Sequence, residues 1–140
     1  MNQPENAGIR SDDMARRRVR LAVVLSAFCL GIAGIALTFA PEEIGGMLGL
    51  NAAPIALQLI GAALLGFGVM NWTARGSTLG GIYGRAVVAG NQMHFTVGAL
   101  ALVKHGLAAG GPPMFWALTI VYLLGAALFL HLLFYGGPRA

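Results

Sequence analysis

Long apolar runs alternate with short polar segments along this chain of 140 residues. The runs cover residues 21–40, 54–72, 82–103 and 114–135, and each is close to the roughly 20 residues that a helix needs to cross a hydrocarbon core of about 30 Å. Apolar runs of this length cannot all be hidden in the core of a small water-soluble domain. The pattern predicts an all-α integral membrane protein with four transmembrane helices.

The segment between the first two runs has the features of a short helix. Pro41 suits the first helical position, and the carboxylates of Glu42 and Glu43 suit the positive end of a helix dipole. Ile44 and the apolar residues one turn later fall on one face. We expect a short helix over residues 41–50, lying in the outer interface of the membrane.

Composition agrees with a chain that lipid covers. Hydrophobic residues make up 57% of the sequence and charged residues 10%, whereas a soluble domain usually carries about 25% charged residues. The mean hydropathy is +0.74. The composition therefore favours lipid, rather than water, as the main solvent of the folded chain.

Positive charge is distributed unevenly and predicts the orientation. Residues 1–20 form a basic leader without an apolar period, and we expect this leader to be disordered and cytoplasmic. An orientation with both ends in the cytoplasm leaves Lys104 as the one outward basic residue, and the tail 136–140 then also faces inward. The run that follows the leader is longer than the apolar part of a signal peptide, so we expect a retained helix. The arginines lie beside the membrane, not on a folded basic face, so no nucleic-acid partner is expected.

Small residues recur on one side of three predicted helices. Close backbone approach along small residues drives helix association in lipid, where no hydrophobic force draws helices together. The three stripes are Ala27, Gly31, Gly34 and Thr38; Gln58, Ala62, Gly66 and Thr73; and Gly84, Asn91 and Gly98. They predict a compact, antiparallel four-helix transmembrane bundle in the inner (plasma) membrane of a bacterium, with the lipid bilayer as its first partner.

Polar residues in the third run are the best candidates for a site, because polar groups inside a bilayer are costly and usually face the protein interior. Asn91 and His94 share one helix face, and Gln92 lies on roughly the opposite face. Together with Asn71 of the second run, these side chains predict a small polar cavity in the cytoplasmic half. The competing interpretation is that they only form hydrogen bonds between neighbouring helices.

The sequence gives little evidence for a catalytic, metal or cofactor site. The acidic residues all lie outside the apolar runs, which argues against a proton relay or a paired-carboxylate enzyme: Glu5, Asp12, Asp13, Glu42 and Glu43. His94, His105 and His131 fall at different depths, so they do not favour haem ligation, and we expect no metal site, no cofactor and no catalytic residue. Cys29, the one cysteine, is expected to be a small buried apolar side chain.

Short motifs in the first half of the chain carry a family resemblance. Residues 39–43 (FAPEE), 47–50 (MLGL) and 60–68 (IGAALLGFG) resemble small bacterial four-helix membrane proteins of the DoxX-like type and related families of unknown function. The resemblance covers the first two predicted spans. It implies an inner-membrane four-helix bundle and an association with membrane redox complexes, and it transfers no catalytic residue.

These observations lead to two functional hypotheses. The leading one is a non-enzymatic membrane protein that acts through contacts, as an accessory subunit of a membrane complex or as a self-associating bundle. The alternative is a binder or carrier of a small lipophilic molecule, a quinone or a lipid, whose polar end would lie beside Asn91, Gln92 and His94.

Overall fold

The computed structural model describes residues 3–76 and 82–135, and these residues form five helices: α1 (Gln3–Phe39), α2 (Pro41–Leu48), α3 (Pro54–Ala74), α4 (Ile82–Ala109) and α5 (Pro113–Tyr135). Four of them are long and apolar enough to cross a membrane, over Arg17–Phe39, Pro54–Ala74, Gly84–Ala109 and Pro113–Tyr135. The four predicted spans are thus present, and the chain is a multi-pass membrane protein. The predicted tail 136–140 lies outside the described residues.

Two boundaries differ from the prediction. The leader that was expected to be disordered is helical from Gln3 onward, as an extension of the first span. Once a helix exists, each further residue adds a hydrogen bond without a new nucleation cost, so the span propagates into the leader. In the same way α4 continues past Lys104 to Ala109, where Gly110 (φ 71°) takes the left-handed conformation that ends many helices.

The short helix α2 forms where the sequence predicted it. Pro41 occupies its first turn together with Glu42 and Glu43. It ends at Gly49, whose φ of 66° is left-handed, and two hydrogen bonds close the end: Gly49 N–H to Gly46 O (3.1 Å) and Leu50 N–H to Gly45 O (2.9 Å). This pair of bonds is a Schellman motif, which satisfies carbonyls that the end of a helix would otherwise leave unpaired.

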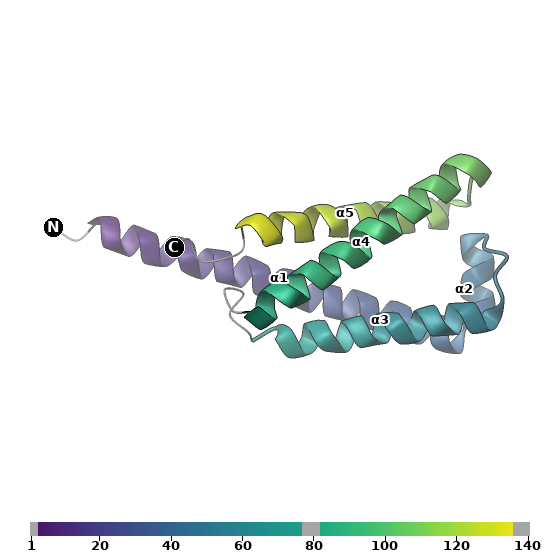
Figure 1. Cartoon of the computed structure of the whole chain (residues 1–140), viewed down its shortest axis with the longest axis horizontal. Coiled ribbons are helices and arrows are strands. Elements are labelled where there is room, and N and C mark those ends of the chain that lie inside the picture. Colours follow the sequence, from purple (N-terminus) through teal and green to yellow (C-terminus); the bar gives the residue numbers. More distant parts are fainter. Residues whose placement is uncertain (1–2, 77–81, 136–140) are drawn as a thin grey trace.

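The long helices form two pairs, as Figure 1 shows: α1 lies beside α3, and α4 lies beside α5. The short helix α2 crosses one end of the molecule, where it contacts α1, α3 and α5. A side chain at Gly49 would come within 2.9 Å of Pro112, so the end of α2 lies against the connection between α4 and α5. At the opposite end the two pairs meet in a core to which all four long helices contribute: Val19, Ala22, Val23, Leu30, Leu64, Val88, Phe95, Phe129 and Leu132.

The outward faces of the long helices are apolar. Large hydrophobic side chains such as Ile32, Leu59, Leu100 and Leu124 are each 66% exposed. A water-soluble protein rarely exposes apolar side chains in such number, whereas a bilayer solvates them at no cost. These faces are the surface that the protein presents to lipid or to other transmembrane helices.

The predicted stripes of small residues have mixed outcomes. The stripe of the first helix is confirmed, since a methyl group at Gly34 would lie 2.7 Å from the backbone of Leu65. The stripe of the second helix is right only at Gln58, whose Nε2 donates to the Thr38 carbonyl of α1 (3.3 Å). Gly66 has open space around it, and the buried side of α3 carries Leu57, Gly61, Leu64, Gly68 and Asn71. The side of a helix that packs is chosen by all its contacts, and here Gly61, Gly68 and Asn71 outweigh Ala62 and Gly66. On α4, Gly84 and Asn91 are buried and Gly98 lies against the Tyr122 ring, as predicted.

Candidate functional site

Asn71 of α3 and Asn91 of α4 face each other through their side-chain amides. The Asn71 Nδ2 group donates to Asn91 Oδ1 (2.9 Å), and Asn91 Nδ2 donates in return to Asn71 Oδ1 (2.6 Å). Both side chains are fully buried, at 0% exposure. Two reciprocal amide hydrogen bonds in a dry interior hold the two helices in one register.

The remaining amide hydrogens also have partners. Asn71 Nδ2 donates to Ser26 Oγ (3.0 Å) on α1, Asn91 Nδ2 donates to the carbonyl of Val87 (2.9 Å), and Ser26 Oγ donates to the carbonyl of Val23 (2.9 Å). We call Ser26, Asn71 and Asn91 the asparagine node. Every N–H of its two amides is used within the chain, so the node ties α1, α3 and α4 together and needs no ligand to complete it.

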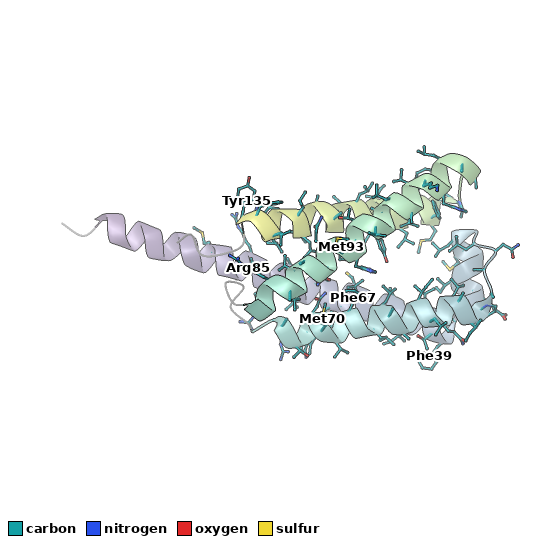
Figure 2. The ribbon with its side chains drawn as sticks, viewed as in Figure 1. Phe39, Phe67, Met70, Arg85, Met93 and Tyr135 are labelled. Carbon is teal, nitrogen blue, oxygen red and sulfur yellow. The ribbon has the colours of Figure 1, made fainter. Side chains whose placement is uncertain are left out.

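His94 belongs to a different cluster, built from aromatic rings. Its Nε2 atom lies 3.2 Å from the Tyr122 hydroxyl on α5, and its ring centroid lies 4.7 Å from the Phe67 ring on α3 and 5.2 Å from the Phe95 ring. Figure 2 shows Phe67 on the side of α3 that faces α4. We call Phe67, His94 and Tyr122 the imidazole cluster. All three are half-buried, and they come from three helices of the two pairs.

Gln92 stands apart from both groups. Its Nε2 donates to Thr96 Oγ1 (2.7 Å), one turn further along the same helix, and its buried Oε1 atom has no hydrogen-bond partner among the described residues. Donor and acceptor are four residues apart on α4, so both lie on the same side of that helix. The Gln92 side chain therefore forms its hydrogen bond within α4 and does not link two helices.

The four residues of the predicted cavity thus fall into three groups. The structure brings Asn71 and Asn91 together, keeps His94 with Tyr122, and leaves Gln92 with Thr96. The competing interpretation, hydrogen bonds between neighbouring helices, describes Asn71 and Asn91 well. A cavity lined by all four side chains stays a prediction.

The three histidines have separate surroundings. His105 packs against the Phe115 ring at a centroid distance of 5.4 Å, and His131 stacks on the Tyr135 ring at 5.0 Å. Within the described ranges, no three His, Cys, Asp or Glu residues lie close enough to share a metal ion. Cys29, which was expected to be buried, is exposed on the outer side of α1. That prediction was wrong because Cys29 lies two positions after Ala27, about 200° around the helix and so away from the predicted packing stripe.

The sequence reasoning missed Phe67 and Tyr122. A phenylalanine in an apolar run carries no signal that separates it from core or lipid-facing residues. Tyr122 did carry one: tyrosine is enriched at the membrane interfaces, and Tyr122 lies near the middle of its span, where a hydroxyl needs a partner.

Comparison with known proteins gives no relative: no protein-family model, no curated protein and no solved structure matches the chain. The resemblance to DoxX-like proteins therefore stays a prediction, and the function has to be argued from the residues themselves.

Proposed function

We propose that this protein is a non-enzymatic, multi-pass protein of the bacterial inner membrane that acts through contacts within the bilayer, as an accessory subunit of a membrane complex or as a self-associating bundle. One observation carries the proposal. The connections 49–53 and 110–112 are short, so helices make up nearly all of the described chain, and their apolar outer faces are its main contact surface. Partners recognise such a surface by helix packing in the membrane.

The asparagine node supports this proposal. Buried polar groups in a membrane protein mark a site when they are left for a substrate or an ion, and here the two amides satisfy each other. The polar interior near Asn71 and Asn91 therefore gives the bundle a defined register. A rigid bundle with a fixed register presents the same outer face to every partner copy.

The proposed topology is an antiparallel bundle with both ends in the cytoplasm. Arg17, Arg18 and Arg20 are placed at the beginning of the first candidate span, and Arg75 at the end of the second. The Arg75 guanidinium lies 3.9 Å over the Trp72 ring and donates to the Trp72 carbonyl (2.5 Å), which is the geometry of an interfacial anchor. Reporter fusions at residue 1 and residue 140 test this topology, and reporters on opposite sides of the membrane would contradict it.

Gentle purification from the native membrane tests the function. The tagged chain is extracted in a mild detergent and everything that elutes with it is identified by mass spectrometry, while light scattering gives the mass of the particle. A stoichiometric second protein, or a particle of two or more copies, supports the proposal. A monomer that elutes without another protein overturns it.

A further inference from the structure

We propose that the imidazole cluster binds the carbonyl oxygen of a flat, lipophilic ring compound of the quinone class. This site goes beyond the proposed contact function and does not depend on it. The cluster keeps only His94 from the predicted polar cavity and adds Tyr122 and Phe67.

Counting the hydrogen-bond donors of His94 and Tyr122 shows that one acceptor is missing. A neutral imidazole carries one N–H and Tyr122 carries one O–H, and each side chain makes its one hydrogen bond among the described residues with the other. If the hydroxyl donates to Nε2, the Nδ1–H of His94 remains; if Nε2–H donates, the hydroxyl hydrogen of Tyr122 remains. In either tautomer one donor lacks an acceptor. A carbonyl oxygen is an acceptor without hydrogens, and it completes the pair in both cases.

The depth of His94 makes the missing acceptor important. His94 follows Gly84 by ten residues and precedes Ala109 by fifteen within the candidate span, which places it about 15 Å and about 22 Å from the two ends at a rise of 1.5 Å per residue. Water is scarce at that depth, so an unpaired donor is costly there. The ester carbonyls of phospholipids lie near the headgroups. A ring carbonyl on an apolar molecule can reach the middle of the membrane.

The surroundings suit a flat ring. The Phe67 ring lies 4.7 Å from the imidazole at an interplanar angle of 31°, and the Tyr122 ring lies 5.4 Å from it at 50°. These are direct contacts between the cluster's own rings, so a flat ligand ring would stack on an outer face of the cluster and not between its members. Phe67, His94 and Tyr122 are each half-buried, so part of each side chain stays accessible to a ligand.

The full chain is tested in nanodiscs of one phospholipid, free of quinone. Decylubiquinone is titrated in, and the ¹⁵N shifts of the His94 ring report on its binding and tautomer, while a photoreactive azidoquinone maps the contact by cross-linking. We expect a saturable shift of the His94 resonance and cross-links to α3, α4 or α5 near the cluster that excess decylubiquinone suppresses. No saturable shift, or cross-links spread evenly over the lipid-facing surface, overturns the proposal.

Matched variants separate binding from folding. Tyr122→Phe removes only the hydroxyl and His94→Phe keeps a ring in place, and we expect each to weaken binding about tenfold, the effect of losing one net hydrogen bond. Tyr135→Phe and His105→Phe make the same changes outside the cluster and should bind like the unmodified chain. Equal binding by Tyr122→Phe and Tyr135→Phe, in variants that keep their helical circular dichroism, overturns the proposal.

Changing the lipid distinguishes a quinone carbonyl from the ester carbonyl of a phospholipid. In nanodiscs of ether-linked lipid, which has no ester carbonyl, the His94 shift in the absence of quinone should be the same as in ester-linked lipid. A change of the His94 shift on this exchange would show that a lipid ester occupies the cluster, and it would overturn assignment to a quinone.

Discussion

The two helix pairs use glycine in different ways. Between α1 and α3, a methyl group at Gly61 would lie 2.6 Å from Thr38 Oγ1, 2.8 Å from the Gly34 carbonyl oxygen and 2.9 Å from the Thr38 nitrogen. Between α4 and α5, a methyl group at Gly125 would lie 2.8 Å from Cε1 of the Phe95 ring, and Gly98 faces the Tyr122 ring in the same manner. In the first pair glycine lets two backbones touch; in the second it makes room for an aromatic side chain.

The difference predicts how each pair responds to added volume. A backbone cannot yield without moving a whole helix, whereas an aromatic side chain can rotate about its χ angles. We therefore expect the α1–α3 pair to tolerate less change than the α4–α5 pair. The α1–α3 pair also resembles the small-residue contacts that hold transmembrane helices together without a hydrophobic force.

Among substitutions that add a single methyl group, the largest effect is expected for Gly61→Ala. Its methyl group meets backbone atoms of α1, so the free energy of unfolding should fall by about 3 kcal/mol, the upper end of the usual cost of overpacking. Unfolding in mixed micelles by added dodecyl sulfate, followed by circular dichroism, measures the change. Gly66→Ala makes the same substitution on the same helix with nothing within 4 Å, and it should not lower stability. Equal losses in the two variants would contradict the backbone contact.

A smaller effect is expected where the two pairs join. Asn91→Leu removes one amide of the asparagine node and leaves Asn71 with a buried oxygen and an unpaired hydrogen, so stability should fall by about 2 kcal/mol. The double variant with Asn71→Leu should lose less than the sum of the two single variants, because each has already broken the shared bonds.

Gln92→Leu is the control for that experiment. Gln92 is the neighbour of Asn91, but its hydrogen bond stays within α4 and its Oε1 is already unpaired among the described residues. Its replacement should leave stability unchanged or slightly higher. A loss at Gln92 that matches the loss at Asn91 would mean that the node does not join the pairs.

The next prediction concerns the α4–α5 pair, where glycine makes room for an aromatic side chain. Gly98→Ala places a methyl group against the Tyr122 ring, and rotation of that ring should limit the loss of stability to about 1 kcal/mol. The same rotation moves the Tyr122 hydroxyl away from His94. The measurement is the unfolding free energy, beside Gly90→Ala, which has open space and should show no loss. A loss as large as that of Gly61→Ala would remove the distinction between the two pairs.

Much of the fold follows from the sequence because the constraints are local. A run of apolar residues needs a helix to satisfy its backbone in lipid, so the four spans could be predicted from length alone. The Schellman end of α2 likewise follows from Gly49 and its neighbours. The side of α3 that packs could not be read, because Ala62 and Gly66 are as small as Gly61 and Gly68 and only the partner helix decides between them.

The candidate site was predicted less completely. Asn71 and Asn91 could be named because amides within apolar runs are rare and costly. The hydrogen bonds between the two side chains could not be predicted, since they depend on where α3 and α4 cross. The separation of His94 from the asparagine node depends on Tyr122 and Phe67, which lie 28 and 27 positions away from it in the sequence. No short-range spacing rule connects them.

The smallest effect is expected for a substitution at Cys29. It compares the exposed side of α1 with the side that packs against α3. Cys29 is exposed and lies two positions after the buried Ala27, which places it about 200° around the helix, on the side opposite the stripe that meets α3. Cys29→Leu should change the unfolding free energy by less than about 0.5 kcal/mol, as for other surface positions. Gly34→Leu, a larger residue on the packed side of the same helix, should prevent the native bundle from forming, because its first side-chain carbon would already lie 2.7 Å from the Leu65 backbone. If Cys29→Leu proved as harmful as Gly34→Leu, the outer side of α1 would be in contact with another helix, and the lipid-facing surface of the α1–α3 pair would have to be placed elsewhere.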